Sequence, residues 1–173
     1  MLALDHRGSF KKLINSASPE SVSDEEMIEV KGALLKATAD DASGFLIDPG
    51  WGLSGYNARS LQNPYLLSIE KTGYESAEKD QKTILESSAA HLLEKGAKGV
   101  KLLLYFNPTG ATSAFQIEVA KEVLADCRAN NLPLFLEIVT YGADGKDSSS
   151  PEAILASVKM FVDAGVSANV YKL

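Results

Sequence analysis

Charged side chains stand at or near the ends of short apolar runs along much of the sequence. These runs have the length and composition of β-strands. The charged residues are Asp5, Asp48, Glu70, Lys101, Glu137 and Lys172. Lys172 has the most distinctive chemistry, because an amine in apolar surroundings loses its proton more readily than a solvated lysine. A neutral lysine can attack a carbonyl group and form an iminium, or Schiff base. The residue types therefore indicate carbonyl chemistry on Lys172.

A second lysine, Lys101, lies inside an apolar run, where a charge is costly to bury unless it is paired or used. Side chains alternate along a strand, so Lys101 should share one face with Leu103 and Tyr105, while the residues between them pack outward on helices. The same alternation gives Glu137 and Lys172 inward positions in their own strands. We therefore expect these three ionisable groups to face a common interior.

The elements that must position these groups alternate regularly. Six short apolar runs predict strands at residues 2–5, 44–48, 65–70, 100–106, 134–139 and 169–173. Four amphipathic stretches predict helices at residues 24–39, 80–95, 113–130 and 151–164, with capping residues at their ends. The link at residues 48–65 reads as a loop with at most a short helix, and residues 142–150 predict a mobile loop at the mouth of the site.

Strands that alternate with helices predict a parallel sheet with helical crossovers. A doubly wound sheet and a (β/α)8 barrel both fit, but no Gly-x-Gly-x-x-Gly motif follows the first strand. Charged strand ends favour the barrel, whose active sites collect side chains from the carboxyl ends of many strands. A complete barrel needs about 250 residues. We therefore predict one domain, residues 1–173, that covers the first six strands of a (β/α)8 TIM barrel.

Composition narrows the classes of partner. The net charge is −6, from 17 basic and 23 acidic residues. The lysines are scattered along the sequence and form no basic stripe, so binding to nucleic acid or to a membrane is not expected. No signal peptide or spanning segment is recognised, so a cytoplasmic location is expected. The single cysteine, Cys127, excludes an internal disulfide and is expected to be a buried or half-buried thiol. A homo-oligomer is left open.

Six stretches carry a resemblance to a known family. They are Leu2-Ala3-Leu4-Asp5-His6-Arg7-Gly8, Leu46-Ile47-Asp48-Pro49 with Gly52-Leu53, Glu70-Lys71-Thr72-Gly73-Tyr74, Val100-Lys101-Leu102-Leu103-Leu104-Tyr105, Phe135-Leu136-Glu137-Ile138 and Val170-Tyr171-Lys172. In this order and spacing the sequence resembles the class I aldolases of the tagatose-1,6-bisphosphate aldolase type. The resemblance implies a (β/α)8 barrel, a sugar phosphate substrate and no metal or other cofactor. Relative to the family, a leading helix and the last two strands are missing.

The resemblance also implies roles for individual residues. Lys172 matches the Schiff-base lysine, and Lys101 matches a second active-site lysine whose charge would favour the neutral amine. Glu137 matches a carboxylate that could move protons during formation and dehydration of the carbinolamine. Asp5 matches a group that could act on the hydroxyl whose proton leaves during cleavage, or could orient the sugar. The last two roles are interchangeable on sequence alone.

Four further residues are expected to bind substrate: His6, Arg7, Glu70 and Lys71. His6 stands where a glutamine is expected in the tagatose bisphosphate enzymes, which leaves the sugar open. Arg7 could bind phosphate or pair with a carboxylate, and Glu70 and Lys71 could form an ordinary ion pair at a rim. Asp48 precedes a proline and fits a turn, so it is left out of the catalytic set.

The expected function is an aldolase that cleaves a ketose phosphate or bisphosphate, of the tagatose or fructose 1,6-bisphosphate type, to dihydroxyacetone phosphate and an aldehyde. Two alternatives stay open. One is a Schiff-base aldolase for another sugar phosphate, sulfonated or inositol-derived. The other is a barrel that binds a sugar phosphate without turnover, against which the joint presence of Lys101, Glu137 and Lys172 speaks, because buried charges are costly to keep.

Overall fold

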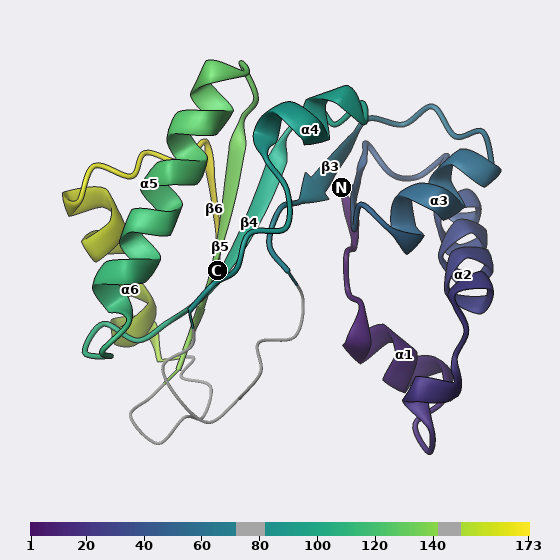
Figure 1. The fold of residues 1–173 in the computed structure, drawn as a ribbon, viewed down its shortest axis with the longest axis horizontal. Helices are drawn as coiled ribbons and strands as arrows, with labels where there is room; N and C mark the ends of the chain where they lie inside the picture. Colours follow the sequence, from purple (N-terminus) through teal and green to yellow (C-terminus); the bar gives the residue numbers. More distant parts are fainter. Residues whose placement is uncertain (72–81, 142–149) are drawn as a thin grey trace. The chain divides into compact units, whose positions relative to one another are not determined.

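The structure is a computed structural model that describes residues 1–71, 82–141 and 150–173. The predicted substrate segment Thr72-Gly73-Tyr74 and residues 142–149 of the predicted mobile loop lie outside these described residues. The chain divides into two compact units, residues 1–68 and 69–173. Figure 1 shows the helices and strands of each unit.

The first unit pairs three short parallel strands. They are β1 (Leu2–Leu4), β2 (Phe45–Ile47) and β3 (Tyr65–Ser68). Leu2 lies opposite Phe45 and Phe45 opposite Tyr65, so the strands start at the same level. The helices are α1 (Gly8–Ile14), the 3-10 turn η1 (Pro19–Ser21), α2 (Asp24–Ala37) and α3 (Trp51–Ala58). All three residues of β2 are buried, as expected for a strand covered on both faces.

Helices α2 and α3 lie side by side in Figure 1, and two glycines let their backbones approach. A Cβ atom at Gly55 would lie 2.7 Å from the carbonyl oxygen of Ile28 and 2.8 Å from the amide nitrogen of Gly32. A Cβ atom at Gly32 would lie 2.9 Å from the carbonyl oxygen of Gly55. A capping box between Ser23 and Glu26 starts α2, with each side chain bonded to the other's backbone N–H.

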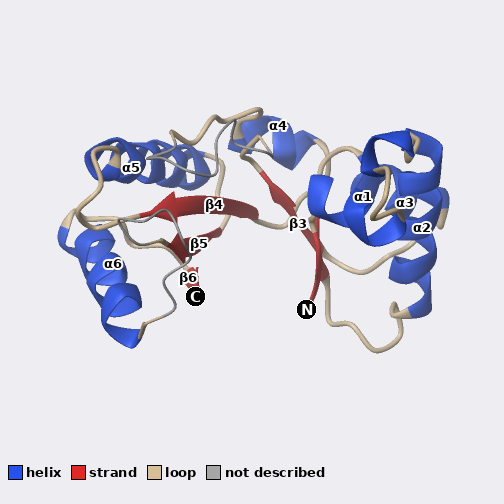
Figure 2. Cartoon of the chain, turned by 90° about the horizontal axis from the view of Figure 1, so that it is seen from below, coloured by secondary structure: helices blue, strands red, loops and turns tan. Residues whose placement is uncertain are grey.

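The second unit also pairs three parallel strands: β4 (Val100–Phe106), β5 (Leu134–Thr140) and β6 (Val170–Lys172). Its helices are α4 (Ala89–Glu94), α5 (Ser113–Ala129) and α6 (Pro151–Asp163). Helices α5 and α6 cover one face of these strands (Figure 2). The rings of Phe106 and Phe161 meet there, with their centroids 4.7 Å apart. The core of the unit therefore lies between the strands and these two helices.

Burial alternates along β4 and β5 as the sequence predicts. Val100, Leu102 and Leu104 are fully buried toward the helices, whereas Leu103 and Tyr105 on the other face are half-buried. Strand β5 has the same pattern, because its residues with odd numbers, including Glu137, are half-buried and the residues between them are buried. The predicted parity is thus confirmed, and the second face of these strands carries the ionisable groups.

Most element boundaries agree with the sequence predictions within two residues, but one helix was predicted too long. Of residues 80–95 only Ala89–Glu94 is helical in α4, and residues 80–81 are not described. The Ser88 hydroxyl accepts from the amide of His91 and starts the helix late, while Leu85 forms a bridge with Glu70. The short helix allowed within residues 48–65 is α3, whereas α1 was not predicted.

The structure bears on the expected burial of Cys127 and on the expected absence of a membrane-spanning segment. Cys127 on α5 is fully buried, and burial, assisted by Asp126, raises the pKa of its thiol to about 12. The predicted buried thiol is therefore confirmed, and its environment disfavours the reactive thiolate. Among the described helices, none has both the length and the apolar character needed to cross a membrane.

We predict that Gly55→Ala destabilises the protein by about 1–3 kcal/mol, because the new methyl group collides with the backbone of α2. Chemical denaturation measures the change. Gly8→Ala is the matched control, since a Cβ atom there meets nothing within 4 Å, and its effect should stay within about 1 kcal/mol. Equal losses in the two variants would contradict the tight contact between the helices.

Candidate active site

Lys101 is the most deeply buried ionisable group of the second unit's sheet face, with 2% of its surface exposed. Its Nζ atom lies 3.2 Å from Glu70 Oε1 and 3.2 Å from Glu137 Oε2. Strand β4 sets the position of Lys101, and its neighbour β5 brings Glu137 to the same face. Two carboxylates thus offset the cost of placing one ammonium group out of water.

Lys172 extends this row of charges. Its Nζ atom donates to Glu137 Oε1 over 2.6 Å, so Glu137 contacts both lysines, one through each oxygen. The register explains the contact, because Leu103 lies opposite Glu137 and Glu137 lies opposite Lys172 in adjacent parallel strands. Paired residues of this kind project to the same side. Four groups, Glu70, Lys101, Glu137 and Lys172, therefore form one continuous network of alternating charge.

Glu70 closes the inner end of this network. One oxygen accepts from Lys101, and the other accepts from the backbone amide of Leu103 over 3.1 Å. The segment that carries Glu70 is held by backbone bonds, from Ile69 to Lys101 and from Lys71 to Ile84. Burial raises the pKa of the Glu70 carboxyl, while the charge of Lys101 and these hydrogen bonds act in the opposite direction.

Exposure increases along the network from Lys101 to Lys172. The side chains of Lys101, Glu137 and Lys172 are 3%, 17% and 45% exposed. The expectation that Lys172 lies in dry surroundings is therefore wrong for this chain. Among the described strands, β6 pairs with β5 alone and is therefore an edge strand. The buried cation is Lys101, and Lys172 is the one that a molecule from solvent can reach.

This arrangement can do nucleophilic and acid–base chemistry. Glu137 can accept a proton from Lys172 along an existing hydrogen bond and return it later. Lys101 contacts the other oxygen of Glu137 and supplies a fixed positive charge beside it. The geometry brings together three of the four predicted catalytic residues and the predicted substrate residue Glu70. Their catalytic roles remain predictions.

Of the other predicted site residues, three lie in the first unit and one in the second. Asp5, His6 and Arg7 follow β1 in the first unit, where His6 Nδ1 lies 4.0 Å from Asp5 Oδ1. The side chain of Asp5 is 9% exposed and that of His6 is 60% exposed. Arg7 donates to the hydroxyl of Ser68 over 3.0 Å. In the second unit the side chain of Lys71 is exposed.

Sequence reasoning missed one buried ion pair. Lys31 on α2 is 0% exposed and contacts Asp48, which is 1% exposed at the end of β2. The sequence predicts a turn at Asp48, and it does not predict a buried partner for Lys31. The available signal was the spacing of Met27, Lys31 and Leu35, which puts a lysine on the buried face of an amphipathic helix.

Within residues 1–71, 82–141 and 150–173, no three His, Cys, Asp or Glu side chains are arranged to hold a metal ion. The four-residue network is instead made of ion pairs between lysines and glutamates.

One known protein family matches almost the whole chain. The family described as DeoC/LacD family aldolase matches residues 1–172. The protein belongs to the DeoC/LacD aldolase family. The family predicted from six sequence stretches is thereby confirmed, and those stretches contain the four members of the ionic network.

Two curated relatives of this DeoC/LacD family member align with most of its length. Tagatose 1,6-diphosphate aldolase from Listeria monocytogenes is 34% identical over 184 aligned positions, which cover 99% of this chain and 54% of the relative. Tagatose 1,6-diphosphate aldolase 2 from Streptococcus pyogenes is 32% identical over 155 positions, covering 87% of this chain and 47% of the relative. The chain thus spans about half the length of the curated relatives it matches.

Solved structures show the fold of this DeoC/LacD family member. A fructose-bisphosphate aldolase from Slackia heliotrinireducens superposes with a TM-score of 0.69 at 18% sequence identity. The match covers 100% of this chain and 55% of the aldolase chain. A Schiff-base-forming fructose-1,6-bisphosphate aldolase superposes with a TM-score of 0.65 at 17% sequence identity. The match covers 95% of this chain and 61% of that aldolase chain. These neighbours are TIM barrels, so the predicted incomplete β/α barrel is confirmed.

We predict that Lys101→Met destabilises the protein by about 3–5 kcal/mol at neutral pH, because it leaves Glu70 and Glu137 without their shared cation. The pKa of Glu70, already raised by burial, rises further without Lys101. A carboxyl whose folded pKa is raised destabilises the fold above its unfolded pKa, and protonation relieves this. The deficit relative to the unsubstituted protein should therefore shrink from pH 8 to pH 5.

Thermal unfolding across that pH range measures the effect. Lys121→Met is the control, because this lysine is half exposed in a surface pair with Glu118, and the loss should stay below about 1 kcal/mol. A deficit for Lys101→Met that is independent of pH would contradict the electrostatic role of the network.

Proposed function

We propose that the protein is a class I aldolase that cleaves a ketose phosphate through a Schiff base on Lys172. The substrate class is that of tagatose or fructose 1,6-bisphosphate, and the products are dihydroxyacetone phosphate and an aldehyde. One observation carries the proposal: a solvent-accessible lysine amine is bonded to a carboxylate that a buried second lysine holds in place. Membership of an aldolase family and the names of the relatives support the same reaction.

The first half of the reaction uses Lys172 and Glu137. Glu137 takes a proton from the Lys172 ammonium, and the amine attacks the ketone carbon of the substrate. The resulting carbinolamine loses water when Glu137 returns a proton to its hydroxyl, and an iminium forms between Lys172 and the sugar. Lys101 contacts the other oxygen of Glu137 and supplies a fixed positive charge beside the reacting groups.

The second half breaks the carbon–carbon bond. A base removes the proton from the hydroxyl beside that bond, the aldehyde departs, and the bonding electrons move into the iminium to give an enamine. Protonation of the enamine at carbon and hydrolysis by water release dihydroxyacetone phosphate and regenerate Lys172. We assign the base to Asp5, because it follows a strand end of the kind where barrel enzymes gather catalytic groups. His6, Arg7, Glu70 and Lys71 are assigned to substrate binding.

Borohydride reduction tests the Schiff base directly. We predict that the full-length protein, incubated with dihydroxyacetone phosphate and borohydride, acquires one reduced adduct on Lys172, which peptide mass spectrometry locates. Lys172→Met should abolish the adduct, whereas Lys159→Met, which removes an exposed lysine of α6, should retain it. An active protein whose Lys172 stays unmodified would contradict the proposed mechanism.

A second substitution tests the proton transfer. We predict that Glu137→Gln lowers kcat roughly 10²–10⁴-fold, because the amide cannot accept the proton of Lys172. Rapid-quench borohydride trapping should show slower adduct formation in this variant. Glu118→Gln is the control, since Glu118 forms a surface pair with Lys121 on α5, and its kcat should not change. Unchanged trapping in Glu137→Gln would assign the proton transfer to another group.

A further inference from the structure

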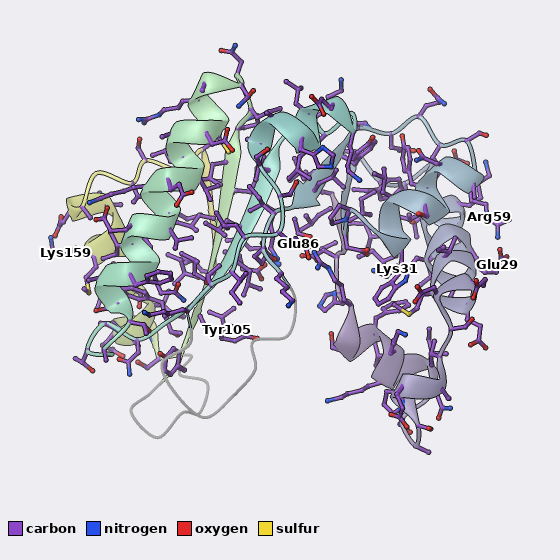
Figure 3. The ribbon with its side chains drawn as sticks, viewed as in Figure 1. Glu29, Lys31, Arg59, Glu86, Tyr105 and Lys159 are labelled. Atoms are coloured by element: carbon purple, nitrogen blue, oxygen red, sulfur yellow. The ribbon has the colours of Figure 1, made fainter. Side chains whose placement is uncertain are left out.

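The ammonium group of Lys31 lies against the backbone that surrounds Asp5. Its Nζ atom donates to the carbonyl oxygen of Leu4 over 2.8 Å and to that of His6 over 2.7 Å. These two carbonyl groups belong to the residues on either side of Asp5. The third contact is with Asp48 Oδ1, so the three protons of the ammonium meet three acceptors. Figure 3 labels Lys31 on α2.

Asp48 is itself anchored by α3. Both of its carboxylate oxygens accept from the amide of Gly52 over 3.1 Å. A Cβ atom at residue 52 would lie 2.8 Å from Asp48 Oδ1, so glycine is needed for this approach. The ammonium of Lys31 is therefore held by the backbone after β1 and by Asp48 after β2, and Asp48 is in turn held by the start of α3.

This arrangement is an expensive way to stabilise a fold. A buried ion pair contributes little net stability, and well-packed apolar residues of similar volume often serve as well or better. Burial lowers the pKa of Lys31, and Asp48 and Asp5 oppose that shift while Arg7 adds to it. What an apolar side chain could not do is bond the two carbonyl oxygens and so determine the path of the chain on leaving β1.

We propose that Lys31 is a positioning residue that fixes the backbone on both sides of Asp5 and thereby sets the direction of the Asp5 and His6 side chains. The proposal rests on the proposed function, in which Asp5 takes part in bond cleavage. Lys31 itself touches no substrate in this role. Its loss should therefore affect cleavage, which needs Asp5, and spare adduct formation on Lys172, which needs Glu137.

The test keeps the buried charge balanced. Lys31→Met alone would leave Asp48 without its cation, so Lys31→Met is made in an Asp48→Asn background, where the side-chain amide oxygen can still accept from Gly52. We expect kcat/KM for cleavage by this double variant to fall roughly 10–100-fold relative to the unsubstituted protein, in which the buried charge is also balanced, as expected when a catalytic group is displaced by about an ångström. The borohydride adduct with dihydroxyacetone phosphate should form at an unchanged rate. Lys36→Met, which removes an exposed lysine of the same helix, should have no effect.

A double-mutant cycle with Asp5→Asn separates positioning from general stability. If Lys31 acts through Asp5, the Lys31 substitution should cost less than about threefold once Asp5 is gone, because coupled residues are not additive. Equal losses with and without Asp5 would overturn the proposal.

Amide hydrogen exchange gives a readout that does not depend on activity. Residues 5–7 should exchange faster when Lys31 is replaced, and unchanged exchange there would also overturn the proposal. Absence of the adduct in the unsubstituted protein would instead refute the proposed function, and the exchange experiment would still report on Lys31.

Discussion

An ammonium group that is almost removed from water must be neutralised by nearby carboxylates, and this requirement organises the second unit. Lys101 is placed within β4, where its neighbours along the strand are apolar. The fold supplies Glu70 from the segment before β4 and Glu137 from β5. Because Glu137 is already committed to Lys101 through one oxygen, its other oxygen is presented to Lys172 with little freedom. The pair of Glu137 and Lys172 is thus oriented by the buried charge of Lys101.

Each unit contains one buried lysine among its described residues, but the partners differ in kind. Lys101 is surrounded by carboxylates, which can gain and lose protons. Lys31 bonds two backbone carbonyl oxygens as well as Asp48, and carbonyl oxygens do not titrate in the physiological range. The first environment suits proton transfer and the second suits fixed geometry. This contrast explains why the same residue type is assigned to chemistry in one unit and to positioning in the other.

The sequence allowed the strands and the common face of Lys101, Glu137 and Lys172 to be predicted because both depend on local signals, whereas the pairing of Glu70 with Lys101 was not predicted. Nearly continuous apolar runs located β4 and β5, and a lysine inside such a run marked Lys101. Helix α4 was predicted too long, because the extended pairing of Leu85 with Glu70 is a tertiary contact that overrides local helical propensity. The role of Asp48 could not be found locally either. A strand-end aspartate before proline reads as a turn, and only the fold reveals that Lys31, seventeen residues earlier in the chain, meets it. The exposure of Lys172 was likewise a tertiary property, because an apolar strand sequence does not reveal which of its sides is covered.

The parallel register of β4, β5 and β6 has a consequence for how such a protein can diverge. Leu103, Glu137 and Lys172 lie at one level of the sheet because the number of residues before each of them in its strand fixes the register. Gain or loss of a single codon inside β5 upstream of Glu137 would turn its carboxylate toward α5 and α6 and replace it with an apolar side chain. Length variation among descendants is therefore confined to the connections between strands, while the strands themselves can change only by substitution.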